Sequence, residues 1–130
     1  MFRAPVDDLV FQLRHVAGLA DVAALDGFPD GVDELVEPIL AEAAKLAETA
    51  IAPLDEAGDR LGARLEDGRV RLPDGYEAAF AALADGGWKG LPFPEDLGGQ
   101  NLPWALTFAV NETLYAANLG FSNCSLLPPR

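Results

Sequence analysis

The sequence predicts an all-α fold, a helical bundle of about five to six helices in which one helix is long and kinked near Pro53. Three observations indicate this class. Half of the 130 residues are hydrophobic, and alanine is common, which suits closely packed helices. Apolar residues recur at spacings of three and four over most of the chain. Clusters of glycine and proline separate these stretches and mark their ends.

The first part of the chain predicts short helical pieces. Residues 5–17 carry apolar side chains at helical spacing, with Pro5 in the first turn and Gly18 as a stop. A short apolar piece follows at 19–25. Residues 26–31 contain two glycines, a proline and two aspartates, so we expect a turn there.

A long helix is predicted from about Val32 to Gly62. Asp30 or Asp33 is expected to cap its start. Pro53 interrupts the pattern, but apolar spacing continues beyond it, so we expect a kink rather than an end. The apolar stripe consists of Leu35, Ile39, Ala43, Leu46, Ala47, Ala50, Ile51, Leu54, Ala57 and Leu61.

The next segment predicts little regular structure before a further helix begins. Apolar and polar residues alternate within residues 63–73, which predicts a very short extended piece. No second strand is evident to pair with it. Asp74 is expected to cap a helix that ends at Gly86 and presents one apolar face, formed by Tyr76, Ala79, Phe80 and Leu83.

The segment 88–103 is an irregular loop that carries many large apolar side chains between its prolines and glycines. A loop of this composition should be pinned onto a core. The helix expected at 103–117 is apolar nearly all round, which is typical of a helix buried on most sides. Asn118 is expected to cap a last helix at 119–127.

The charge of the chain limits its partners. Twenty-one acidic and nine basic residues give a formal charge of −12, which disfavours nucleic acid and anionic membranes as partners. No apolar run approaches the ~20 residues that span a bilayer. With one cysteine, Cys124, and no secretory signal at the N-terminus, the sequence favours the cytoplasm.

Residues that could do chemistry are few. His15 and Cys124 are the only residues of their kinds, and a zinc site would need several carboxylates besides them. We expect His15 to be structural or on the surface, and Cys124 to be a small buried hydrophobe. Glu112 lies in the most apolar helix, where a carboxylate needs a partner or an exposed position. No residue is expected to be catalytic, to bind a cofactor or to bind a metal.

Several motifs resemble the acyl-CoA dehydrogenase family, in the order in which they occur there. The signal is carried by residues 87–91 (Gly-Trp-Lys-Gly-Leu), 94–100 (Pro-Glu-Asp-Leu-Gly-Gly-Gln) and 111–118 (Asn-Glu-Thr-Leu-Tyr-Ala-Ala-Asn). Residues 4–8 (Ala-Pro-Val-Asp-Asp) and 52–54 (Ala-Pro-Leu) resemble the longer-chain branch related to 3-methylmercaptopropionyl-CoA dehydrogenase. Asn101 departs from the pattern, because a glycine is common at this point of the loop.

The resemblance implies a fragment of a larger enzyme. Family members are FAD-dependent oxidoreductases of fatty acid metabolism, which remove hydrogen from Cα and Cβ of an acyl-CoA thioester. They consist of an N-terminal helical domain, a β domain and a C-terminal helical bundle. This chain resembles the first of these, so we expect a single domain, with residues 1–30 as a helical extension and 31–130 as the family-like part, truncated from its parent.

In the family, the FAD-binding segments and the catalytic glutamate lie mainly in the later domains. The resemblance therefore implies FAD in the parent enzyme, but none bound to this chain alone. The remaining domains and an acyl-CoA substrate are the implied partners. The N-terminal domain forms part of the acyl-pocket wall, and the candidate wall residues here are Phe108, Glu112, Tyr115 and Leu119. Alternatively, Phe108 and Tyr115 are ordinary core residues.

A second interpretation keeps the fold and changes the role. The chain could be a stand-alone acidic helical interaction module without enzymatic activity. An acyl carrier protein is the obvious case, but the Asp-Ser-Leu attachment motif at a helix start is missing. A severed domain should also expose apolar surface. We therefore expect self-association through the region 88–127.

Overall fold

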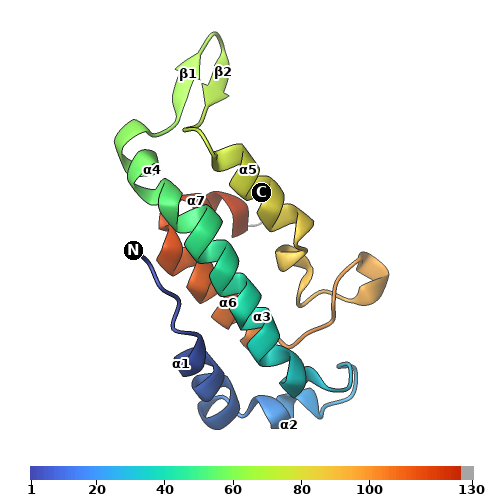
Figure 1. The fold of residues 1–130 in the computed structure, drawn as a ribbon. Coiled ribbons are helices and arrows are strands. Elements are labelled where there is room, and N and C mark those ends of the chain that lie inside the picture. Colours follow the sequence, from blue (N-terminus) through green and yellow to red (C-terminus); the bar gives the residue numbers. More distant parts are fainter. Residues whose placement is uncertain (127–130) are drawn as a thin grey trace.

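The computed structural model describes residues 1–126, which form a helical bundle with one small hairpin (Figure 1). The all-α prediction is confirmed, and counting α3 and α4 as one interrupted helix gives six helices in this part of the chain. The predicted helix end at Leu127 lies outside it, as does the side chain of Cys124. The elements are α1 (Val6–Phe11), α2 (Leu19–Ala23), α3 (Val32–Leu46), α4 (Asp55–Leu61), β1 (Arg64–Glu66), β2 (Arg69–Arg71), α5 (Tyr76–Asp85), α6 (Trp104–Ala117) and α7 (Leu119–Leu126).

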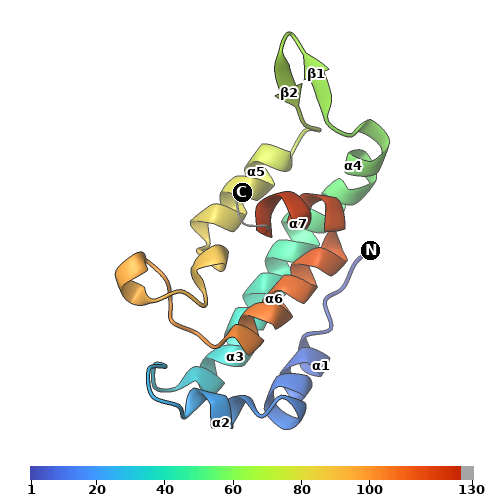
Figure 2. The same ribbon diagram turned by 180° about the vertical axis from the view of Figure 1, so that it is seen from behind.

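The core lies between α3 and α6, which pack side by side in the centre of the molecule (Figures 1 and 2). Helix α1 packs against α3 near one end, and α7 packs against α6 and α4 near the other. The fully buried large side chains come from several elements and include Leu19, Val36, Leu40, Ile51, Leu83, Leu106, Val110 and Leu114.

The long helix continues through Pro53 as predicted, but its hydrogen-bonding pattern changes there. Helix α3 passes into a π-helical turn at Ala47–Ile51 and a 3-10 turn at Ala52–Leu54 before α4 begins. Proline has no N–H to donate to the preceding turn, so the regular ladder cannot be kept. Helix α4 ends at Gly62 with a φ of 60°.

The predicted inward face of α3 was wrong in its first two turns. Leu35 is 42% exposed, whereas Val36 and Leu40 are fully buried. The predicted face through Leu35 and the observed face through Val36 and Leu40 both satisfy helical spacing, because the sequence there has apolar residues on two adjacent faces. The packing of α3 against its neighbouring helices buries Val36 and Leu40. Packing therefore decided between two faces that periodicity alone did not separate.

The prediction that residues 63–73 lack a second strand was also wrong. Strands β1 and β2 pair antiparallel, with Arg64 opposite Arg71 and Leu65 opposite Val70. Asp67 and Gly68 make the turn between them with φ values of 49° and 74°. A two-residue turn with positive φ at both positions suits the twist of a hairpin, and Asp-Gly is a strong signal for it.

Two of the three predicted caps were wrong. Gly31 stands at the N-cap of α3 and Gly75 at that of α5, with no side-chain cap hydrogen bond in either case. Asp30, Asp33 and Asp74 therefore do not cap these helices. The third prediction is confirmed, because the Phe121 N–H donates to Asn118 Oδ1 over 2.9 Å at the start of α7.

Helix α4 and the start of α5 meet at Gly58, against which the side chain of Tyr76 packs closely. A Cβ added at Gly58 would overlap the hydroxyl oxygen of Tyr76 and lie 3.2 Å from its Cζ. We expect Gly58→Ala to lower the free energy of unfolding by about 1–3 kcal/mol, as overpacking does. In a Tyr76→Phe background the hydroxyl is gone, and the same change should have a smaller effect. Urea unfolding of the four variants measures the coupling, and equal effects in both backgrounds would contradict it.

Candidate functional site

Three of the four predicted wall residues lie on one exposed face of α6. Phe108, Glu112 and Tyr115 follow one another at spacings of four and three, which places them on the same side of a helix. Phe108 is 63% exposed, Glu112 is exposed and Tyr115 is half-buried. Phe108 is therefore not a core residue of this chain.

Leu119 lies apart from those three residues, at the start of α7. The backbone between the two helices is extended at Asn118, where φ is −165°. Leu119 is 59% exposed. The structure thus brings Phe108, Glu112 and Tyr115 together on one helix face and leaves Leu119 on the next element.

The opposite face of α6 fixes the orientation of this site. Its inward residues are almost fully buried, with Leu106 and Val110 at 0% exposure. Thr113 also lies inside, and its hydroxyl donates to the carbonyl oxygen of Ala109 over 3.1 Å. An apolar inward face and an aromatic outward face explain why the sequence of this helix looks apolar nearly all round.

An aromatic row extends the exposed face toward the preceding loop. The ring centroids of Trp104 and Phe108 are 5.8 Å apart, and those of Phe93 and Trp104 are 6.2 Å apart. Trp104 is 52% exposed and Phe93 is exposed as well. Neither residue was among the predicted site residues. The position of Trp104, four residues before Phe108, was the available signal.

A groove of about 290 Å³ runs between α6 and the first helix. Phe108 and Glu112 form one wall. The other wall comes from α1 and the π-helical turn Gln12–Val16 that continues it, and includes Leu9, Leu13 and Val16. Most of the residues that line the groove are apolar, and Glu112 is the acidic residue among them. Sequence reasoning missed the wall formed by α1, because helix spacing does not say which helices become neighbours.

The loop 88–103 sets where α6 begins. Two short arms of the loop pair with each other: Gln100 N–H donates to the carbonyl of Gly90 over 3.0 Å, and Leu102 N–H donates to that of Leu91 over 2.8 Å. Leu91 and Leu102 are buried. The loop is therefore pinned onto the core at these two residues, as predicted, whereas Phe93 and Leu97 of the same loop are exposed.

Asn101 occupies the loop position at which the resembling family commonly has glycine. Its φ is 51°, in the left-handed region. Asparagine adopts this region more readily than most residues with a side chain. The side-chain Nδ2 donates a hydrogen bond to the carbonyl of Gly27. Asn101 therefore adopts a backbone conformation that favours glycine, and its side chain adds a link to the turn before α3.

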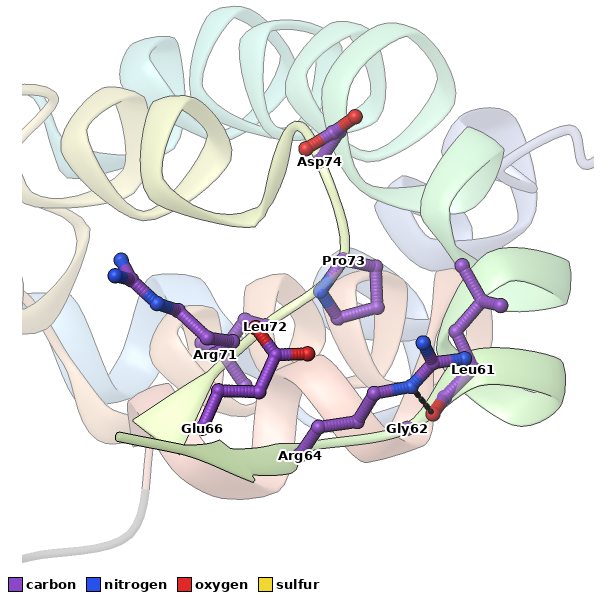
Figure 3. Close-up of a pocket in the computed structure, with 8 residues that line it drawn as sticks. All are labelled: Leu61, Gly62, Arg64, Glu66, Arg71, Leu72, Pro73 and Asp74. Carbon is purple, nitrogen blue, oxygen red and sulfur yellow. Dashed lines mark hydrogen bonds between the residues drawn. The ribbon is translucent and has the colours of Figure 1, made fainter. Parts of the chain in front are cut away.

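A second hollow, of about 320 Å³, lies under the hairpin (Figure 3). Arg64 and Arg71 line it together with Glu66 and Asp74. Arg64 turns toward the end of α4, where its Nε donates to the carbonyl of Leu61 over 3.4 Å, and Arg71 points away from Arg64 (Figure 3). The two guanidinium groups do not converge, so the hollow is not a ready anion site.

Other groups with chemical potential are dispersed. His15 is exposed, as expected, and its ring centroid lies 5.0 Å from that of Phe11. Within residues 1–126, no three His, Cys, Asp or Glu side chains are grouped closely enough to hold a metal ion. In the same part of the chain, none of the helices has both the length and the apolar character needed to span a bilayer.

The chain is similar along most of its length to two acyl-CoA dehydrogenases. It is 36% identical over 126 residues to 3-methylmercaptopropionyl-CoA dehydrogenase of Ruegeria pomeroyi, which covers 97% of this chain and 21% of that protein. It is 30% identical over 119 residues to the broad-specificity linear acyl-CoA dehydrogenase FadE5 of Mycobacterium tuberculosis, which covers 90% of this chain and 20% of that protein. No protein-family model matches the chain.

These matches confirm the predicted resemblance, and the chain is a homologue of acyl-CoA dehydrogenases. It spans about a fifth of the length of the curated relatives that it matches. A relationship over nearly all of this chain and a small part of each relative is what a fragment of such an enzyme gives.

The hollows described so far, and one of about 410 Å³ beside α4, do not fit FAD. The 410 Å³ hollow is lined by Asp55 and Asp59 without a lysine or arginine. The hollow under the hairpin pairs its two arginines with two acids. A pyrophosphate needs clustered N–H groups or cations, so neither of these two hollows offers a site for the pyrophosphate of FAD.

Proposed function

We propose that this chain is the N-terminal helical domain of an FAD-dependent acyl-CoA dehydrogenase. In this role it supplies acyl-pocket wall and domain packing for the α,β-dehydrogenation of an acyl-CoA thioester, and it contributes no catalytic residue. The observation that carries the proposal is the exposed aromatic face of α6, next to an apolar groove, in a chain homologous to about a fifth of two such enzymes. A cytoplasmic location belongs to the same proposal.

An aromatic face of this kind is energetically unfavourable in water. Phe93, Trp104 and Phe108 form one row of exposed rings, and Val16 across the groove is exposed too. Each large apolar side chain gains about 1.5–3 kcal/mol when it is fully buried. Contiguous apolar patches of this kind mark interaction sites or ligand grooves. The remaining domains and an acyl chain are apolar partners that would cover it.

Glu112 limits how the face is covered. An ionised carboxylate is costly to bury without a partner. It is exposed in this chain and lies at the groove. In the parent enzyme we expect the side chain to meet a basic or hydrogen-bonding group, or to remain in water at the edge of the covered surface.

The proposal can be tested in a chimeric enzyme. This chain would replace the matching 126 residues of the Ruegeria pomeroyi 3-methylmercaptopropionyl-CoA dehydrogenase. We expect the chimera to fold, to purify with flavin and to oxidise its acyl-CoA substrate in a dye-reduction assay. Phe108→Asp should lower kcat/KM by about tenfold or more, because a charge would enter a desolvated wall.

The matched control is Leu35→Asp, which places the same charge at a partly exposed leucine on α3. It should leave kcat/KM nearly unchanged. A folded chimera without activity would overturn the proposed role of the chain. Equal losses in the two variants would overturn the role of the α6 face.

Self-association of the isolated chain is a second consequence of the proposal. The exposed row of rings falls within the region 88–127 from which we predicted it. Analytical ultracentrifugation of the 130-residue chain should show a concentration-dependent dimer, and Phe108→Asp should shift the equilibrium toward monomer. A clean monomer at high concentration would contradict this. The alternative of a stand-alone acidic module shares the aromatic face, but it does not account for the homology.

A further inference from the structure

The β1–β2 hairpin projects from one end of the bundle, beyond α4 and α5 (Figure 1). Every residue of both strands is exposed, and each strand packs chiefly against the other. A two-stranded hairpin is marginally stable in water unless further strands or a helix pack on it. The strands here have three residues each, so the described part of the chain does little to hold the hairpin in place.

The two faces of the hairpin differ in character. Leu65 lies opposite Val70, and opposite residues of paired strands share a face. Leu65 is 75% exposed and Val70 is 67% exposed, so this face is apolar and uncovered. The other face consists of Arg64, Glu66, Arg69 and Arg71. The hairpin therefore presents an apolar face and a basic face to its surroundings.

The hairpin is also the basic part of an acidic chain. Residues 60–71 contain four of the nine basic residues of the chain and two of its 21 acidic residues. Arg60 pairs with Glu56 over 2.8 Å. Arg69 and Arg71 form no ion pair with any residue in the described part of the chain. The protruding element thus keeps two guanidinium groups free, although the rest of the chain is rich in carboxylates.

We propose that the hairpin is a docking element for the part of the parent enzyme that lies outside this chain. The inference rests on the proposed function. The chain spans about a fifth of the length of its relatives, so about four-fifths of such an enzyme is available to cover the hairpin. The matching surface carries an apolar patch for Leu65 and Val70 and acidic groups for Arg69 and Arg71. Exposed apolar side chains and arginines are both typical of protein interfaces.

This surface is separate from the groove beside α6. The groove lies near α1, at the other end of the bundle from the hairpin (Figures 1 and 2). Contacts at both ends would fix the orientation of this domain relative to the rest of the enzyme. The hairpin adds complementarity of charge, which selects one docking orientation over others.

Hydrogen exchange of the hairpin amides tests the proposal, in the isolated 130-residue chain and in the chimeric enzyme described above. We expect the amides of residues 64–71 to exchange at nearly unfolded rates in the isolated chain, and at least about tenfold more slowly in the chimera. Strong protection already in the isolated chain would overturn the proposal, because the hairpin would then need no partner.

The chimera separates this inference from the proposed function. A chimera that holds flavin and is active, but exchanges its hairpin amides as fast as the isolated chain, would overturn the inference and leave the proposed function intact. A chimera without flavin or activity would overturn the proposed function, and with it the occupant named here.

Single substitutions test the two faces. Val70→Ser and Arg71→Glu should each restore rapid exchange of the hairpin in the chimera. Both residues are exposed in the isolated chain, so its urea midpoint should not change. Arg71→Glu also places an acid opposite Arg64, which favours the hairpin itself, so a loss of protection in this variant reports docking.

The matched control is Lys45→Glu, which reverses the same charge at a side chain that is 69% exposed on α3. It should leave the protection of the hairpin unchanged. Charged residues on short exposed strands can also serve only to prevent pairing with other strands. In that case Arg71→Glu would not change the protection, and the role of the basic face would be overturned.

Photo-cross-linking identifies the occupant. With p-benzoylphenylalanine in place of Leu65, the chimera should form cross-links to peptides of its Ruegeria pomeroyi part within one polypeptide. No band of twice the subunit mass should appear. A cross-linked dimer would show that a second subunit covers the hairpin, and would overturn the occupant proposed here.

Discussion

Gly99→Ala is expected to be among the most destabilising single substitutions in this chain. A Cβ at this position would overlap the carbonyl oxygen and carbon of Phe93. Both are backbone atoms, so no side-chain rotation relieves the clash. The two arms of the loop would have to separate, and the hydrogen bonds that join them at Gly90 and Leu91 would be lost. We expect a loss of about 3 kcal/mol or more in the free energy of unfolding, measured by urea denaturation.

A matched control exists in α7. Gly120 is exposed, and a Cβ there would meet only Asn118 Oδ1, at an ordinary distance of 3.6 Å. Gly120→Ala should therefore be neutral or slightly stabilising, as alanine usually is in a helix. If Gly99→Ala and Gly120→Ala had similar effects, the tight pairing of the loop arms would not exist in solution.

Leu106→Ala and Phe108→Ala, two residues apart on α6, are expected to differ strongly. Leu106 is fully buried against the core, so its truncation should cost about 2–5 kcal/mol. Phe108 is larger but mostly exposed, and surface truncations usually stay within about 0.5 kcal/mol. Thermal and urea unfolding of the isolated chain, at a concentration where it is monomeric, would measure both.

The comparison of Leu106→Ala with Phe108→Ala tests which face of α6 is turned toward the core. Circular dichroism should show that both variants keep their helical content under native conditions. A larger loss for Phe108→Ala than for Leu106→Ala would mean that the helix turns its aromatic face inward. The aromatic surface would then no longer be available to a partner.

The helices were predictable because their signals are local. Spacings of three and four located α3 and α6 within a few residues, and the continuation past Pro53 followed from apolar residues on both sides of it. The hairpin was missed although its signal was local as well. Asp67-Gly68 is a hairpin-turn signal, but the three-residue strands on either side of it were too short to show a period.

The predicted N-caps of α3 and α5 were wrong for a different reason. Aspartate is a good cap wherever the backbone before a helix is extended, but Gly31 and Gly75 are left-handed, with φ values of 77° and 92°. Glycine next to aspartate offers two ways to start a helix, and propensity alone favours the aspartate. The tertiary approach angle of the chain decides which is used.

The candidate site was only partly predictable. Phe108, Glu112 and Tyr115 share a face because all three lie on one helix, which spacing alone establishes. The groove also needs Leu9 and Leu13, and their position beside α6 depends on how α1 packs on α3. The apolar periodicity of a helix does not show which distant helix it contacts.

The packing of α1 has a consequence for the order in which the chain is made. Leu9 and Leu13 belong to the same core cluster as Ala109 and Val110. During synthesis α1 can pack on α3 once residues 32–46 have been made, but its contacts with α6 must wait for the last third of the chain. At about 5–20 residues per second, this wait lasts on the order of ten seconds. The side of α1 that faces α6 therefore stays uncovered during this interval, while the side that faces α3 is already packed.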